Sequence, residues 1–187
     1  MIEVEKRSFV SKEKYEQLIN YFKSNNYILK EEKQVTTYFK GDTDFRLMNT
    51  PDYLKLWLKK GQIHDDAREE MNVVVEKKYE TDLVKMLNVL GYEEEIKWYR
   101  KRLELQYEDF EVTIDYSIGY GYIVEFELMV NDESKVDRAK EKIEELFNKF
   151  DIENTPKEEF NNRYNDYKIN WKNYTNNISD EEFLNKI

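Results

Sequence analysis

The first residues of the chain, MIEVEKRSF, place two carboxylates and a guanidinium at alternate positions: Glu3, Glu5 and Arg7. Because alternate residues of a β-strand point to the same side, these three side chains share one face of a predicted strand. Glu125 and Glu127 repeat the spacing in the later stretch YIVEFELMV. Closely spaced carboxylates repel each other unless a divalent cation lies among them. The pattern therefore predicts either a plain solvent-exposed face or a metal site.

Several other stretches alternate in the same way, with apolar residues on one face and charged residues on the other. Their charged positions include Lys55, Lys59, Arg68, Glu70, Arg100, Arg102, Glu111 and Asp115. An antiparallel sheet with one face in water would show this alternation too, and that alternative stays open at this point. A covered face would have to compensate its charges, because an unpaired ion is costly to remove from water. A metal-bound polyphosphate would satisfy the carboxylates and the cations together.

Composition limits the chemistry further. The chain has 187 residues, a formal net charge of −10 and no cysteine. Its excess of acidic residues argues against a general surface for nucleic acid or anionic membranes. With no cysteine and a single histidine, His64, any metal is expected to be a hard ion held by carboxylates. The chain lacks a long apolar run and the apolar core of a signal peptide, so the predicted location is cytoplasmic.

The elements that would position these residues are strands and a few helices. Helical periodicity appears at 11–26, 81–91 and 132–150, with Ser11 and Thr81 as expected N-caps. In the second of these segments, Val84, Leu87 and Leu90 form the expected apolar stripe. The remaining alternating stretches predict strands. We expect an α+β protein with one domain over 1–174 and a short helical extension over 175–187.

These motifs, in this order, resemble the CYTH family of triphosphate tunnel metalloenzymes, which includes class IV adenylyl cyclases, thiamine triphosphatases and inorganic triphosphatases. The similarity covers roughly residues 1–165 and begins with the family's ExExK motif, here Glu3-Val-Glu5-Lys-Arg7 with arginine in place of lysine. Later family motifs resemble QVTTYF, DFRLM, LWLKKG, AREE, YRKR and TIDYSIGYGYIVEFE. Within DFRLM, Met48 replaces the second arginine of the family.

The resemblance implies an eight-stranded antiparallel β tunnel, a closed or nearly closed barrel, with a charged interior and α-helices packed outside. The implied metal ligands are Glu3, Glu5, Asp115, Glu125 and Glu127, with Glu70 as an additional candidate. The implied phosphate ligands are Arg7, Arg46, Lys55, Lys59, Arg68, Arg100 and Arg102. Glu3, Glu5 and Arg7 are the expected catalytic residues. The expected cofactor is Mg²⁺ or Mn²⁺, because both accept oxygen ligands.

Three functions are consistent with these residues. The main hypothesis is a metal-dependent hydrolase of inorganic triphosphate or a small organic triphosphate, because phosphoryl transfer needs positioning and charge neutralisation rather than a nucleophilic side chain. An adenylyl cyclase that makes cyclic AMP and pyrophosphate from ATP is the alternative enzyme. A polyphosphate- or nucleotide-binding module is the third, because a guanidinium at position 7 cannot act as a base and Met48 removes a phosphate donor.

The expected partner is therefore a small-molecule triphosphate, with no nucleic acid and no membrane. A homodimer is a further hypothesis, since Trp98 and Trp171, which we expect to be exposed aromatic residues, would suit a contact between subunits.

Overall fold

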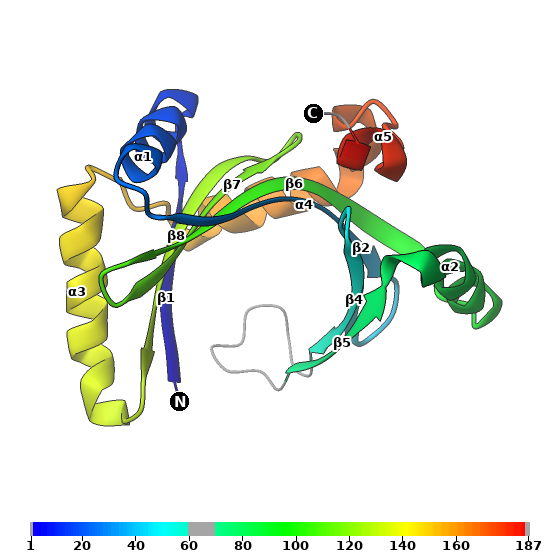
Figure 1. Ribbon diagram of the computed structural model, residues 1–187, viewed down its shortest axis with the longest axis horizontal. Helices are drawn as coiled ribbons and strands as arrows, with labels where there is room; N and C mark the ends of the chain where they lie inside the picture. Colours follow the sequence, from blue (N-terminus) through cyan, green and yellow to red (C-terminus); the bar gives the residue numbers. More distant parts are fainter. Residues whose placement is uncertain (1, 60–69, 186–187) are drawn as a thin grey trace. The chain divides into compact units, whose positions relative to one another are not determined.

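The structure is a computed structural model that describes residues 2–59 and 70–185 (Figure 1). The strands are β1 Ile2–Val10, β2 Ile28–Phe39, β3 Asp44–Asn49, β4 Tyr53–Lys59, β5 Glu70–Glu76, β6 Glu94–Tyr107, β7 Phe110–Ser117 and β8 Gly121–Val130. The α-helices are α1 Lys12–Ser24, α2 Glu80–Val89, α3 Val136–Lys149, α4 Lys157–Tyr174 and α5 Asp180–Asn185. Short 3₁₀ turns, Lys77–Tyr79 and Glu133–Lys135, precede α2 and α3.

The strands form one sheet in the order β1-β8-β7-β6-β2-β3-β4-β5, with antiparallel neighbours throughout the pairs whose register is defined. This confirms the α+β class and the eight antiparallel strands. Closure into a barrel is not found, since β1 and β5 are the two ends of the strand order in the described residues. The chain divides into two compact units, which are described separately below.

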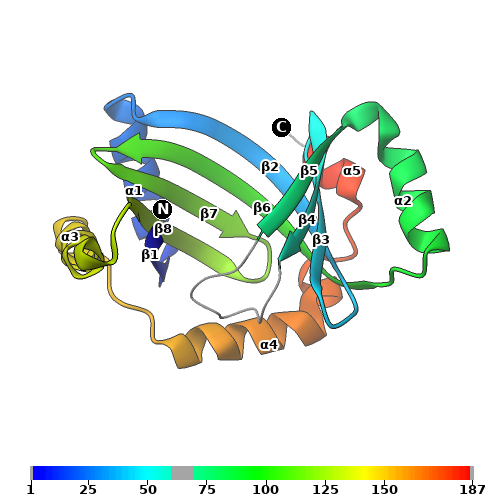
Figure 2. The ribbon, with the colours of Figure 1, turned by 90° about the horizontal axis from the view of Figure 1, so that it is seen from below.

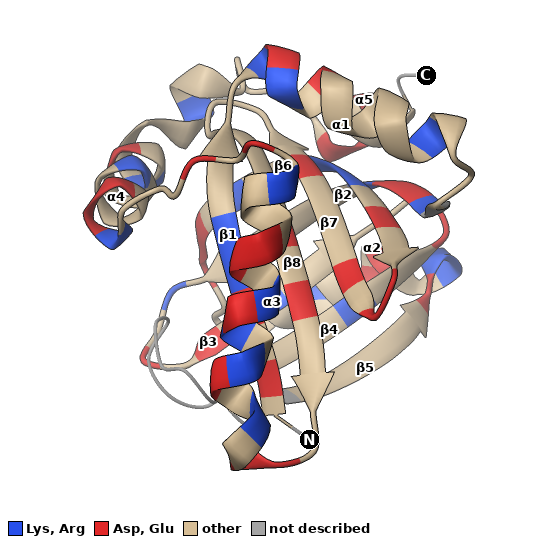
Figure 3. Cartoon of the chain, turned by 90° about the vertical axis from the view of Figure 1, so that its left-hand side faces the viewer, with Lys and Arg blue, Asp and Glu red and all other residues tan. Residues whose placement is uncertain are grey.

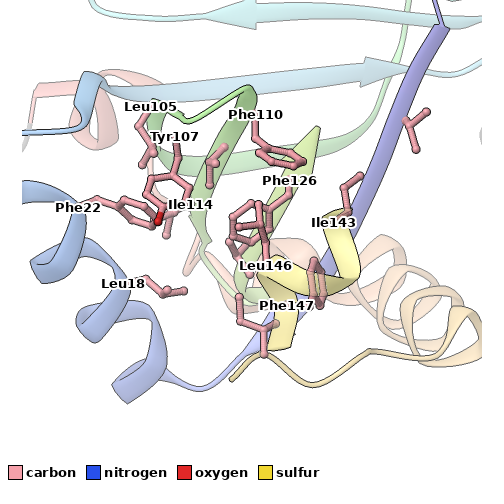
Figure 4. Close-up of a cluster of buried hydrophobic side chains, with 14 of the residues drawn as sticks. Leu18, Phe22, Leu105, Tyr107, Phe110, Ile114, Phe126, Ile143, Leu146 and Phe147 are labelled. Carbon is pink, nitrogen blue, oxygen red and sulfur yellow. The ribbon is translucent and has the colours of Figure 1, made fainter. Parts of the chain in front are cut away.

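Unit 1 comprises Met1–Glu32 and Lys101–Asp166. In this unit α3 packs against β1 and β8, and α1 packs against β8 (Figure 1). Figure 4 shows the core between them, where Phe22 of α1, Phe126 of β8 and Phe147 of α3 are among the buried side chains. The alternation of the strands explains this layer, because one face of each strand supplies the apolar residues that the helices cover. The opposite face keeps the charged residues.

The two helices of this layer agree with the sequence patterns. Ser11 caps α1 by accepting a hydrogen bond from the backbone N–H of Lys14 at 3.1 Å, as predicted. The apolar residues that recur at helical spacing in α1 and α3 face the core. Burial of large apolar side chains, each worth about 1.5–3 kcal/mol, therefore fixes both helices on the sheet.

Unit 2 comprises Lys33–Arg100 and Tyr167–Ile187. Here α2 covers β3 and β4 (Figure 2), and Leu87 packs with Leu47 and Leu54. The predicted N-cap of α2 is wrong, because the helix begins at Glu80 and Thr81 lies inside its first turn. The predicted stripe is also shifted, since the side chains that reach the core are Leu83 and Leu87, one helical turn apart.

The remaining members of the predicted stripe point outward. Val84 is 39% exposed and Leu90 is 69% exposed. Gly91 does end the helix, and its φ of +85° explains why glycine stands there.

Helix α4 was not predicted from the sequence. Its buried side includes Tyr167, which stacks on Trp98 of β6 with ring centroids 4.2 Å apart. Trp98 and Trp171 are both buried, so the expectation that they could form a subunit contact is wrong for these two residues. No helix in the described ranges is both long enough and apolar enough to cross a membrane.

Helix α5 lies within the segment 175–187. In α5 the backbone N–H of Glu182 donates a hydrogen bond to Ser179 Oγ at 3.0 Å. Asp180 accepts hydrogen bonds from Lys97 and Tyr99 of β6, each at 3.0 Å. Phe183 and Leu184 are buried, so this segment is packed into unit 2.

Candidate functional site

The charged face of unit 1 carries a row of three glutamates on three neighbouring strands. Glu5 of β1 is the register partner of Glu127 of β8, and Glu127 is also the partner of Glu111 of β7. Figure 3 shows the acidic residues along β7 and β8. Directly opposed residues of antiparallel strands have Cβ atoms about 4.5–5.5 Å apart, and like charges at these positions are destabilising. This acidic row therefore destabilises the fold, and the packing of the sheet gives no reason for its presence.

The next row places a cation among the carboxylates. Arg7 of β1 is the partner of Glu125 of β8, which in turn is the partner of Thr113 of β7. Lys6, in contrast, lies on the helix-covered side, where it pairs with Glu144 of α3 and contacts the ring of Phe147. This placement agrees with the prediction that Arg7, and not Lys6, shares the face of the carboxylates.

Burial and like charges change the titration of the two β8 glutamates. Burial, together with the charges of Glu3, Glu111 and Glu125 and a hydrogen bond with Glu3, raises the pKa of Glu127 to about 7. Burial and the charge of Glu5 also raise the pKa of Glu125, while Arg102 and Arg7 oppose that rise. Both shifts arise first from burial and then from the neighbouring carboxylates, so bringing these two glutamates together in their charged form is unfavourable.

Asp115 is the partner of Arg102 at the β6–β7 end of this face. Arg102 Nε and Nη2 donate hydrogen bonds to the two carboxylate oxygens of Asp115 at 2.9 and 2.6 Å. Asp115 is only 5% exposed. Burial lowers the pKa of Arg102, but the charge and hydrogen bonds of Asp115 outweigh it, so the pKa is raised overall and the guanidinium stays charged. Arg102 is therefore held in a fixed position.

The predicted cations of unit 2 have partners of their own. Arg46 donates hydrogen bonds to both carboxylate oxygens of Asp44, at 2.6 and 2.5 Å, and its guanidinium lies 4.2 Å from the centroid of the Tyr38 ring. Lys55 Nζ lies 4.2 Å from the centroid of the Trp57 ring. Arg100 is partly buried on β6. Aromatic and carboxylate neighbours thus fix the two cations of β3 and β4.

Three predicted residues cannot be placed. Arg68 lies outside the described residues, and the side chains of Lys59 and Glu70 are not described. Their predicted roles stay predictions.

The donor set of the acidic row fits a hard divalent ion, because every candidate ligand is a carboxylate. In residues 2–59 and 70–185, however, no group of three or more acidic side chains is close enough to hold a metal ion in its present rotamers. The backbone register already brings Glu5, Glu127 and Glu111 together, and glutamate side chains have several low-energy rotamers. A metal site here would require these side chains to turn toward one another.

Two residues of these clusters were missing from the predicted ligand set. Glu111 was expected on the charged face but was given no role, because only the register of β7 with β8 shows that it lies beside Glu127. Asp44 was overlooked, although its i, i+2 spacing from Arg46 is the signal that could have identified the pair.

Comparison with known proteins agrees with this arrangement of strands. The sequence matches the CYTH domain over residues 1–159. The chain belongs to the CYTH domain family. CYTH proteins are often enzymes and are in general metal-dependent. The search of curated proteins gave no match.

Solved structures with the CYTH fold are similar to this chain. A conserved hypothetical protein from Pyrococcus furiosus is 21% identical with a TM-score of 0.63, over 81% of this chain and 91% of that one. A proposed adenylate cyclase from Bacillus halodurans is 21% identical with a TM-score of 0.60, over 83% and 92%. Another from Vibrio parahaemolyticus is 19% identical with a TM-score of 0.61, over 85% and 97%. At these identities the similarity establishes the fold.

Proposed function

We propose that this CYTH protein is a divalent-metal-dependent triphosphatase that hydrolyses inorganic triphosphate or a small organic triphosphate within a tunnel-like site. The observation that carries the proposal is the acidic row of Glu5, Glu127 and Glu111 with Arg7 and Arg102 on the same face of unit 1. Carboxylates for a metal and guanidinium groups for phosphate are the two sets of groups that phosphoryl transfer requires.

The acidic residues of unit 1 have the role of metal ligands in this proposal. The residues that would hold Mg²⁺ or Mn²⁺ are Glu3, Glu5, Glu125 and Glu127. The high density of negative charge on their face favours binding of a cation. When bound, the ion neutralises phosphate oxygens and lowers the pKa of a water molecule. Both carboxylate oxygens of Asp115 accept hydrogen bonds from Arg102, so Asp115 can be a metal ligand only if these oxygens contact the metal and Arg102 together.

The basic residues orient the substrate. Arg102 is held by Asp115 and presents a fixed positive charge, while Arg7 lies beside Glu125 at the edge of the acidic row. Arg7 donates hydrogen bonds to phosphate and takes no part as a base, because a guanidinium stays protonated. Glu3, Glu5 and Arg7 remain the proposed catalytic residues. The proposed phosphate ligands in unit 2 are Arg46, Lys55, Lys59, Arg68 and Arg100.

The proposal is tested by phosphate release from inorganic triphosphate, thiamine triphosphate and ATP, with Mg²⁺, with Mn²⁺ and with EDTA. We expect metal-dependent release that Glu5→Gln abolishes. Glu141→Gln is the matched control, because Glu141 is an exposed glutamate of α3 that pairs only with Arg138 among the described residues. Equal activity of Glu5→Gln and the wild type would contradict the assignment of the acidic row.

An adenylyl cyclase is the second candidate, favoured by the two proposed adenylate cyclases among the similar structures. Product analysis with ATP separates the two enzymes. Cyclic AMP with pyrophosphate indicates the cyclase, and orthophosphate indicates the hydrolase. Binding of triphosphate with no product would indicate a binding module.

A further inference from the structure

The guanidinium of Arg7 lies over an aromatic ring supplied by α4. Its central carbon is 5.1 Å from the centroid of the Phe160 ring. Phe160 in turn stacks on Phe9, the next residue of β1 on the same face as Arg7, with centroids 4.6 Å apart. Arg163 closes the cluster, with its guanidinium 4.0 Å from the centroid of the Phe9 ring. All four residues belong to unit 1.

The start of α4 is fixed to β1 by a short connecting segment. Thr155 Oγ1 accepts a hydrogen bond from the backbone N–H of Phe9 at 2.9 Å, and the backbone N–H of Thr155 donates to Ser8 Oγ at 2.9 Å. Ser8 is fully buried. Because Thr155 lies five residues before Phe160, these bonds determine where the first turn of α4 places the Phe160 ring.

We propose that Phe160 is a positioning residue that holds Arg7 in the orientation in which it binds a phosphate group, an inference that rests on the proposed function. An arginine that contacts a ring through its face keeps its N–H donors free in the plane of the guanidinium. Among the described residues, Arg7 makes no hydrogen bond that competes with an anion; its contacts there are the Phe160 ring and the charge of Glu125. The ring therefore limits the rotamers of Arg7 without occupying its donors.

Contact with the Phe160 ring would reduce the entropic cost that Arg7 incurs when it binds an anion. A long side chain on a strand loses rotamer freedom when it binds an anion, and that loss weakens binding. A ring that already restricts the side chain reduces the loss. Phe160→Leu keeps an apolar side chain but removes the ring face, whereas Phe160→Tyr keeps the face.

The test is a double-mutant cycle between Phe160→Leu and Arg7→Gln. Calorimetry measures binding of the imido analogue of inorganic triphosphate with Mg²⁺, and phosphate release is measured in parallel. We expect Phe160→Leu to weaken binding about two- to five-fold when Arg7 is present and not at all in Arg7→Gln. Phe160→Tyr should bind like the wild type. Circular dichroism melting confirms that each variant is folded.

A second readout needs no ligand. The Phe160 ring should shift the NMR signals of the Arg7 side-chain protons upfield in the wild type and in Phe160→Tyr, and the shift should be absent in Phe160→Leu.

The outcomes separate the two proposals. Equal losses in both Arg7 backgrounds, or no loss in either, would overturn the positioning role while leaving a hydrolytic wild type intact. Binding with the expected coupling but without phosphate release would overturn the triphosphatase and support the positioning role. A wild type that does not bind the analogue would overturn both.

Discussion

Arg102 of β6 and Asp115 of β7 form an ion pair with two hydrogen bonds, at 2.9 and 2.6 Å, on the charged face of unit 1. A pair of this geometry, with one partner almost fully buried, differs from the exposed ion pairs of the helices. Removing one partner leaves the other charge buried, which costs more than the pair itself contributes. The pair therefore provides a direct test of how the face is built.

We expect Asp115→Asn to lower the free energy of unfolding by about 2–4 kcal/mol, because Arg102 loses its charged acceptor while its side chain stays mostly buried, at 21% exposed. Urea denaturation at pH 7 measures this change. The matched control is Asp109→Asn, which removes an exposed aspartate that pairs with Lys142 at 3.6 Å. Similar losses in the two variants would show that the Arg102 pair is no more important than a surface pair.

Glu127 predicts a pH dependence of stability. Burial and the neighbouring charges of Glu3, Glu111 and Glu125 raise its pKa from the ordinary 4.5 to about 7, so the folded state binds a proton more tightly than the unfolded state. Stability without metal should therefore fall as the pH rises from about 4.5 to about 7 and stay lower above that range. Glu127→Gln should remove this loss.

Thermal melts in EDTA at pH 4, 6 and 8 measure the effect. Because Glu127 is partly exposed, water screens the repulsion, and we expect Glu127→Gln to gain about 1 kcal/mol at pH 8 and nothing at pH 4. Glu133→Gln, a change at an exposed residue before α3, is the control. A gain of equal size at pH 4 and pH 8 would argue against titration of Glu127.

Glu111→Gln tests whether the third strand contributes to the acidic row. Since Glu111 is the register partner of Glu127, we expect the substitution to weaken Mn²⁺ binding about tenfold, as measured by electron paramagnetic resonance titration of free Mn²⁺. Glu108→Gln, in the turn that joins β6 and β7, is the control and should bind Mn²⁺ like the wild type. Unchanged affinity in Glu111→Gln would exclude Glu111 from the metal ligands.

Asp44→Asn tests the competition between a carboxylate and a phosphate for Arg46. Asp44 accepts two hydrogen bonds from Arg46, so its neutralisation should lower the free energy of unfolding by about 1–3 kcal/mol. It should also strengthen binding of the imido analogue of inorganic triphosphate, as measured by calorimetry. Asp52→Asn, in the turn after β3, controls for the change in net charge. Weaker binding in Asp44→Asn alone would mean that Asp44 orients Arg46 for its ligand.

One part of the site was predictable because side chains alternate between the two faces of a β-strand. Alternation alone placed Glu3, Glu5 and Arg7 on one face, and the packing of Lys6 against α3 agrees with it. The pairing of strands was not predictable in the same way, because β1, the first strand in the sequence, pairs with β8, the last. Glu111 consequently could not be recognised as the neighbour of Glu127 from its own strand.

Helix α4 shows where local patterns are insufficient. Its sequence is rich in asparagine and tyrosine and lacks an aliphatic stripe, so the usual signal of an amphipathic helix is weak. Its place depends instead on a few aromatic contacts, among them Phe160 on Phe9 and Tyr167 on Trp98. Such contacts involve residues far apart in the sequence, and only the tertiary structure shows them.

The raised pKa of Glu127 has a consequence for any ion that the acidic row accepts. With a pKa of about 7, Glu127 carries a proton in part of the molecules at neutral pH, and a metal ion must displace it. Binding would then release protons to the solvent, so the heat observed in calorimetry would vary with the ionisation enthalpy of the buffer. The apparent affinity for the metal would rise with pH up to about 7 and then level off, making occupancy of the site sensitive to small changes in acidity near neutrality.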